Sequence, residues 1–279
     1  MDTMTGADQS NRPAIAAALE HDMIGRVMLR AGSRVFQSVY SPVFEHGNGV
    51  LKPVFVTAHC ADVLSDTDGE ARQTGSGRAG ERVAAAMHRA NLVFRDPEHL
   101  GYCEVLPERG QLRDHALGGL LAGARASGLE AEQVIWHCGA QGTARRVEAC
   151  RIARDMGMKV CASLDLREDG LPDLAGFTPD IVQMSPQWSA GLLAGVPGAA
   201  RLARTVTEAL EAEGSAVWMD AIGTTAELQA ALNAGVRYLQ GPALGKPVVA
   251  GSETGWRSLN VQALLMEHEG AVVPLRRRG

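Results

Sequence analysis

From about residue 80 to residue 241 the chain alternates between short apolar runs and longer amphipathic segments. Short apolar runs separated by helical patterns are typical of strand–helix–strand units, which build sheets of parallel strands. The runs predicted as strands span residues 99–107, 133–138, 159–165, 180–184, 215–220 and 236–241. Helices are predicted at about 80–95, 111–127, 143–157, 197–214 and 225–235, with a final helix at about 253–268.

Two further β-rich runs precede this alternation, at residues 34–44 and 50–60. The pair Asn48-Gly49 between them is a strong signal for a tight turn, so these runs are predicted to form a hairpin. Eight strands in 279 residues suit one α/β barrel, which needs about 250 residues. We therefore predict an α/β fold, a (β/α)8-like TIM-type barrel with an antiparallel first strand.

An open, doubly wound sheet is the alternative architecture. It would require a glycine-rich phosphate turn between an early strand and a helix. The early glycines Gly47 and Gly49 fall in the predicted hairpin instead, which favours the barrel.

The ends of the chain are predicted to lie outside the barrel. Residues 1–31 are interpreted as a polar tail and a helix over about 13–31, because Pro13 suits a first helical turn and apolar residues recur at spacings of four. This helix either covers a barrel end or contacts a partner or second copy in a homodimer. Residues 32–268 form the predicted barrel, residues 62–80 a long mobile loop within it, and residues 269–279 a C-terminal tail.

The bulk composition excludes several classes of function. A net charge of −5 and a pI near 5.9 argue against binding to a nucleic acid polymer. No apolar run approaches the roughly 20 residues that span a membrane, so no membrane association is predicted. The five cysteines contain no C-x-x-C pair, which fits a reducing, cytoplasmic location.

Several segments match the motif order of one barrel family. Asp220 stands where a strand ends, and Gln240-Gly241 precedes Pro247. Residues 163–174 (SLDLREDGLPDL) and 180–188 (DIVQMSPQW) occupy the preceding strand ends. Over roughly residues 30–250 the chain resembles EAL domains, the family that includes bacterial cyclic di-GMP phosphodiesterases and that also begins with a hairpin.

The resemblance implies a site in which carboxylates hold two divalent cations for phosphodiester hydrolysis. Most of these acids are replaced. The Glu-Ala-Leu position corresponds to Thr57-Ala58-His59, and the asparagine ligand falls on or near Glu104. The glutamate of the fourth strand falls near His137.

The later motifs depart from the family in the same way. Asp165 is kept from the aspartate pair, but its neighbour is Leu166, whose aliphatic side chain cannot ligate a cation. The lysine position is Gln183, and the second acid after Asp220 is Gly223. Two-metal hydrolysis is therefore not expected.

The resemblance and its departures together predict a catalytically inactive EAL-like signalling module. We expect this module to act by binding an unknown signalling protein. Whether it also retains binding of cyclic di-GMP is left open. No cofactor is expected. The predicted ligand-binding residues are Thr57, Asp165, Gln183, Asp220 and Gln240. We expect these five, together with Glu104 and His137, to converge at one barrel mouth.

The alternative function is an enzyme. It is either a cyclic di-GMP phosphodiesterase dependent on Mg²⁺ or Mn²⁺, or a barrel hydrolase with one metal ion. Glu104, His137 and Asp165 form a mixed nitrogen and oxygen set that suits one zinc, manganese or iron ion. A polar cluster without metal is the favoured interpretation of these three residues.

Overall fold

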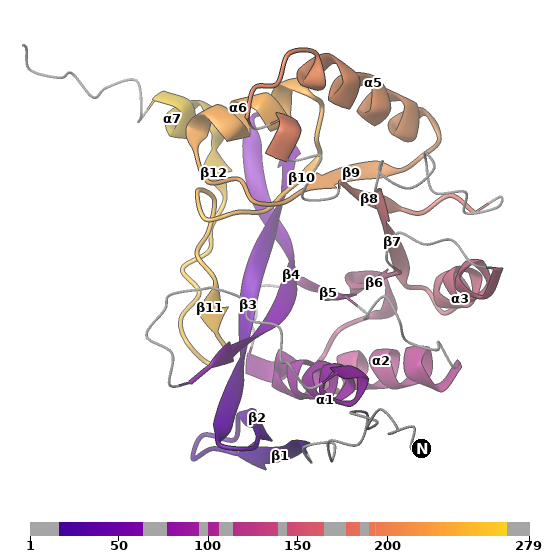
Figure 1. Ribbon diagram of the computed structural model, residues 1–279, viewed down its shortest axis with the longest axis vertical. Helices are drawn as coiled ribbons and strands as arrows, with labels where there is room; N and C mark the ends of the chain where they lie inside the picture. Colours follow the sequence, from indigo (N-terminus) through magenta and orange to yellow (C-terminus); the bar gives the residue numbers. More distant parts are fainter. Residues whose placement is uncertain are drawn as a thin grey trace, which may run out of the picture.

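The computed structural model describes residues 17–63, 77–94, 100–105, 114–138, 144–164, 177–184, 190–192 and 194–266. Eight strands form a closed barrel at its centre (Figure 1). They are β3 (Arg34–Gly47), β4 (Val50–Asp62), β5 (Gly101–Val105), β6 (Val134–His137), β7 (Lys159–Leu164), β8 (Ile181–Met184), β9 (Ala216–Met219) and β10 (Tyr238–Leu239). The predicted barrel is confirmed.

Strand β3 closes the barrel. The strands from β4 to β10 pair in chain order and in parallel. β3 pairs antiparallel with β4 on one side and with β10 on the other, where Tyr238 lies opposite Glu45. The prediction of an antiparallel first strand is confirmed.

The turn between β3 and β4 has the predicted position. Asn48 and Gly49 both have positive φ, 52° and 72°, as a two-residue turn of the type favoured in hairpins requires. The strands are longer than predicted, since they extend to Gly47 on one side and Asp62 on the other.

Helices cover the outside of the barrel (Figure 1). They are α1 (Gly77–Ala90), α2 (Asp114–Ala126), α3 (Ala144–Asp155), α5 (Ala199–Ala212) and α6 (Thr225–Asn233), with short 3₁₀ turns at η1 (Asn91–Phe94) and η2 (Ala131–Gln133). Each amphipathic segment predicted between strands forms a helix. The segment 64–76, within the predicted long loop, lies outside the described residues.

Side chains alternate between the barrel interior and the helix layer. The interior cluster is Val43, Phe55, Cys103, Ile135, Cys161, Ile181, Trp218 and Tyr238. Their chain neighbours, such as Trp136 and Val182, pack outward in the clusters beneath the helices. All five cysteines are buried with free thiols, as expected for small apolar residues.

The predicted helix over residues 13–31 is wrong. Its described part forms β1 (Ala17–His21) and β2 (Val27–Ala31), an antiparallel hairpin that joins the free edge of β3. The Asp22 carboxylate accepts bonds from the backbone N–H groups of Ile24 and Arg26 and makes the turn. Local turn chemistry and pairing with β3 outweigh the apolar spacing of four.

The C-terminal helix is shorter than predicted. After β11 (Val248–Val249), the chain forms β12 (Leu259–Asn260) and then α7 (Val261–Met266). β12 pairs with the start of β4, and the Asn260 side chain accepts a bond from the N–H of Ala263 in α7. Residues 267–268 lie outside the described residues. No described helix is long and apolar enough to cross a membrane.

A buried polar network joins the N-terminal hairpin to the barrel. The Asn91 side chain donates to the Val27 carbonyl and accepts from the Val27 N–H, and it also donates to Ser38 Oγ. Ser38 Oγ lies 2.9 Å from His88 Nδ1, and Cys60 Sγ lies 3.6 Å from His88 Nε2. Burial lowers the pKa of His88 to about 3 and raises the pKa of the Cys60 thiol to about 11. These groups are neutral and structural.

This network predicts acid sensitivity. His88 has a folded-state pKa of about 3 against an ordinary value of 6.5. Its contribution to stability is complete above pH 6.5 and decreases as pH falls toward 3, by up to about 1.4 kcal/mol per pH unit. We expect urea unfolding to show a flatter pH profile between pH 7 and 4.5 for His88→Gln than for the unmodified chain. Parallel profiles for the two proteins would contradict this role.

Candidate functional site at the barrel mouth

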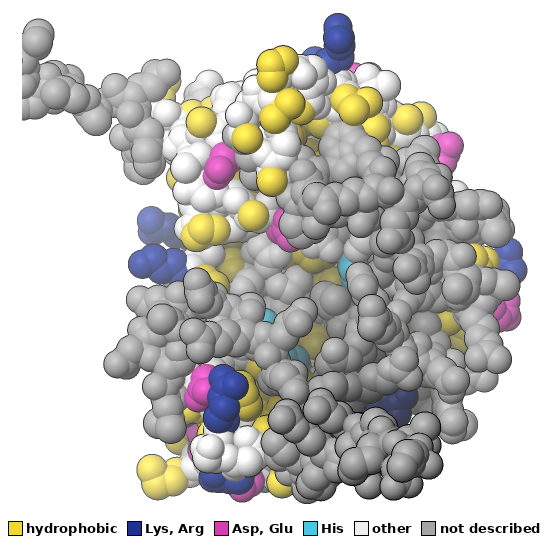
Figure 2. Space-filling model, viewed as in Figure 1, with side chains coloured by type: hydrophobic (Ala, Val, Ile, Leu, Met, Phe, Trp, Pro, Cys, Tyr) yellow, Lys and Arg dark blue, Asp and Glu magenta, His cyan; other side chains and the backbone are white. Residues whose placement is uncertain are grey.

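The carboxyl ends of the parallel strands meet at one end of the barrel, where active sites of such barrels lie. The residue two places after each interior side chain points to the same face, and those residues therefore line the mouth. On the strands from β4 to β10, the polar residues at these positions are Thr57 on β4, His137 on β6, Ser163 on β7, Gln183 on β8, Asp220 after β9 and Gln240 after β10. Figure 2 shows histidine side chains deep in the central part of one face of the molecule.

Gln240 spans the closing seam of the barrel. Its Nε2 donates to Thr57 Oγ1 at 2.8 Å and to the Ser41 carbonyl at 3.3 Å. One amide thus connects β10, β4 and β3. The structure brings two predicted ligand-binding residues, Thr57 and Gln240, into direct contact.

Gln183 and Asp220 form a second pair. Gln183 Nε2 donates to Asp220 Oδ2 at 3.3 Å, and Asp220 Oδ1 is buried without a hydrogen-bond partner in the part of the chain described. Burial raises the pKa of Asp220, while hydrogen bonds from the backbone and from Gln183 act in the opposite direction. Gln183 thus supplies a neutral amide to a partly desolvated acid.

Histidines supply the remaining polar groups. His137 Nε2 lies 3.0 Å from Ser163 Oγ, and the imidazole meets the Trp218 ring edge-on at 6.4 Å. His59, two residues beyond Thr57, is half-buried, and burial lowers its pKa. Ser163 and His59 were not predicted as site residues. The alternation of side chains along β7 and β4 was the signal that could have identified them.

The loops beside the mouth are fixed by backbone contacts. The Ile222 N–H donates to the Gln240 carbonyl, and the Ala243 N–H donates to the Ile222 carbonyl. Ala221 has a positive φ of 62°, which is costly for a residue with a Cβ atom and commonly marks functional loops. The Glu227 carboxylate accepts from the N–H groups of Gly223 and Thr224 and so caps α6.

The expectation that Glu104 reaches the mouth is not met. Its neighbour Cys103 is in the barrel interior, so Glu104 faces the helix layer. Arg89 Nη1 contacts its two carboxylate oxygens at 2.6 and 2.8 Å, and the Tyr102 hydroxyl lies at 3.5 Å. Burial raises the pKa of Glu104, and Arg89 opposes this shift.

Glu104 and His137 therefore lie on opposite faces of the sheet, which does not support a metal ion held by both. Asp165, the third member of that set, and its neighbour Leu166 lie outside the described residues. Within the described ranges, no group of three or more His, Cys, Asp or Glu side chains is placed to hold a metal ion.

The fold is that of EAL domains. The chain superposes on Bacillus subtilis YkuI, a protein with an EAL domain in complex with substrate c-di-GMP and calcium (TM-score 0.65, 16% identity, 83% of this chain and 60% of that one). It also superposes on Klebsiella pneumoniae BlrP1 in a manganese/cyclic di-GMP complex (TM-score 0.66, 16% identity, 88% of this chain and 62% of that one). The third similar structure is a standalone EAL protein from Vibrio cholerae in its c-di-GMP-bound form. It has a TM-score of 0.63 and 14% identity, and the match covers 78% of this chain and 94% of that one.

This chain spans about three fifths of the length of YkuI and BlrP1. No protein-family model matches its sequence, and no curated protein sequence matches it. The likeness to EAL domains is therefore one of fold.

A substitution at Gly241 tests the close contact between the two loops beside the mouth. A Cβ atom at Gly241 would lie 2.2–2.6 Å from backbone atoms of Ile222. We expect Gly241→Ala to lower the free energy of unfolding by at least about 2 kcal/mol, because backbone atoms must move apart. In the control Gly119→Ala, an added Cβ in α2 has no neighbour within 4 Å, and stability should rise by up to about 1 kcal/mol. Equal effects of the two substitutions would contradict the close contact.

Proposed function

We propose that this chain is a non-hydrolytic module with the EAL fold, which acts by binding at its barrel mouth. The observation that carries the proposal is the chemistry of the described inner positions. Thr57, Ser163, Gln183, Gln240 and the histidines present hydroxyl, amide and imidazole groups, and Asp220 is the carboxylate among these described positions. The mouth is built for hydrogen bonding.

The divalent cations that the family resemblance implies do not fit these residues. Two Mg²⁺ or Mn²⁺ ions need several hard oxygen ligands, and hydrolysis needs them close together. Asp220 is partly buried and bonded to Gln183, while Glu104 faces outward to Arg89. We derive no reaction step through a metal ion.

Protein binding is the activity we propose first. Figure 2 shows apolar side chains over the region of α5, α6 and α7. Val196, Leu202 and Met266 are exposed there, each with more than half of its surface accessible. These groups lie on or beside α5 and α7, apart from the six mouth positions, and offer a further apolar surface for contact with another protein. None of the six mouth positions carries an arginine or a lysine that could pair with a phosphodiester.

Cyclic di-GMP binding without hydrolysis is the second candidate. It is supported by the fold shared with YkuI, BlrP1 and the Vibrio protein, whose structures contain that nucleotide. Gln240 and Thr57 could contribute hydrogen bonds to a nucleotide at the mouth. Calorimetric titration of the chain with cyclic di-GMP, with and without Mn²⁺, separates this candidate from protein binding alone.

We expect no hydrolysis of cyclic di-GMP in the presence of Mg²⁺ or Mn²⁺. The same result is expected for Leu166→Asp, because one added carboxylate cannot replace several missing ligands. Chromatography of the nucleotide after long incubation measures this, with an active EAL phosphodiesterase as the positive control. Turnover that Asp220→Asn abolishes, or activity gained in Leu166→Asp, would overturn the non-hydrolytic proposal.

A further inference from the structure

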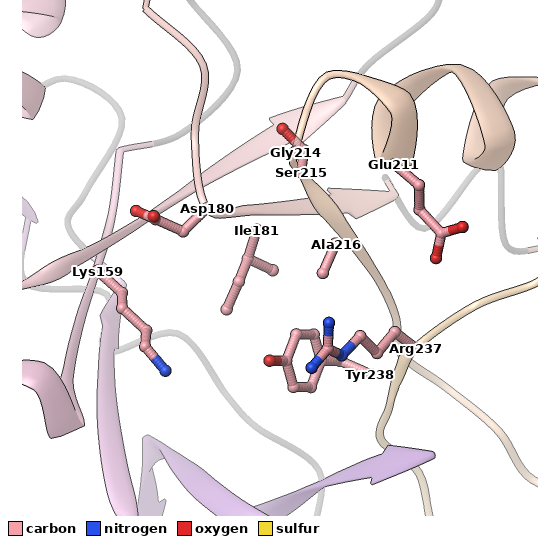
Figure 3. Close-up of a pocket in the computed structure, with 9 residues that line it drawn as sticks. All are labelled: Lys159, Asp180, Ile181, Glu211, Gly214, Ser215, Ala216, Arg237 and Tyr238. Atoms are coloured by element: carbon pink, nitrogen blue, oxygen red, sulfur yellow. The ribbon is translucent and has the colours of Figure 1, made fainter. Parts of the chain in front are cut away.

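A cavity of about 380 Å³ lies at the end of the barrel opposite the mouth (Figure 3). It is formed where β7, β8, β9 and β10 begin, together with the turn between α5 and β9. Its volume is in the range of small-molecule sites. Nothing in the proposed activity of the mouth uses it.

Two hydrogen-bond donors face each other across this cavity. Figure 3 shows the Lys159 ammonium and the Tyr238 hydroxyl directed toward one another from different strands. Lys159 is exposed and forms no ion pair with any described residue, and the Tyr238 hydroxyl has no hydrogen-bond partner among the described residues. Both groups are therefore available to an acceptor that enters the cavity.

Arg237 contributes a third donor. Its guanidinium lies over the Tyr238 ring, 5.7 Å from the centroid. Nε and Nη2 donate to one oxygen of Glu45 at 2.8 and 2.6 Å, and Nη1 has no described acceptor. The ion pair with Glu45 holds the guanidinium in place and leaves one edge available.

The carboxylates at the cavity have other partners or lie at its edge. Asp180 accepts from the Val160 N–H at 2.8 Å and lies 3.3 Å from Arg154. In Figure 3 its oxygens point toward the backbone of β7 and not toward the Lys159 ammonium, and Glu211 lies on the far side of Arg237. The space between Lys159 and Tyr238 is thus lined by donors.

We propose that this cavity is a second binding site, which takes a small oxyanion, a phosphate or carboxylate group. The anion accepts hydrogen bonds from Lys159 and the Tyr238 hydroxyl, with Arg237 Nη1 alongside. Charge-assisted bonds of this kind are stronger than bonds between neutral groups. The site is separate from the mouth. Its residues lie at the amino-terminal ends of β7 to β10, whereas the mouth is formed at the carboxyl ends of these strands.

Titration of the full chain with inorganic phosphate tests this proposal, followed by phosphorus-31 line broadening and calorimetry at constant ionic strength. A parallel titration with acetate tests whether the site also binds a carboxylate group. We expect saturable binding, weakened at least tenfold by Lys159→Gln and about tenfold by Tyr238→Phe, which keeps the ring. Lys246→Gln, which changes a lysine outside the cavity, should bind as the unmodified chain does.

Phosphate also stabilises proteins by exclusion from their surfaces, so a rise in thermal midpoint alone is not sufficient. Absence of saturable binding of both anions, or equal binding by Lys159→Gln, would overturn the second site. Neither result would affect the proposed function of the mouth.

Discussion

The antiparallel pairing of β3 with both β4 and β10 is the constraint on which the rest of the structure depends. It closes eight strands into a barrel, and closure places Ser41, Thr57 and Gln240 within hydrogen-bond reach although they come from distant parts of the chain. The same long hairpin carries the additions at both ends, since β2 and β11 pair with β3 and β12 pairs with β4. Without the seam there would be neither a mouth nor a platform for these additions.

Alternation along the strands then decides the chemistry of each face. Inward positions at the carboxyl ends carry amides, hydroxyls and imidazoles around Asp220. The buried acid Glu104 instead points toward the helix layer, where it forms an ion pair with Arg89. A buried carboxylate without a cation would be strongly unfavourable, so Arg89 satisfies a structural need. Among the described residues, the arrangement separates a charged structural pair outside the barrel from inward mouth positions whose one carboxylate is that of Asp220.

Much of the fold could be predicted from the sequence, because strands and helices in the barrel have clear periodicities and Asn48-Gly49 suits one turn type. The helix over 13–31 could not be distinguished from a hairpin, since Leu19, Met23 and Val27 also suit strands and a turn once β3 offers an edge.

The positions of some candidate site residues could be predicted, while their ligand-binding role stays a prediction. Thr57, Gln183, Asp220 and Gln240 do meet at the mouth in two pairs. Glu104 does not, because a shift of one residue along a strand moves a side chain to the opposite face. A motif comparison without strand register cannot resolve that shift, and Asp165 lies outside the described residues.

Titration of the chain with Mn²⁺, followed by calorimetry and by paramagnetic relaxation of water, tests most directly the claim that this EAL fold has a mouth without a two-metal centre. We expect no stoichiometric binding at micromolar Mn²⁺ and no change on Asp220→Asn. Two Mn²⁺ ions bound per chain, with affinity lost in Asp220→Asn, would contradict it.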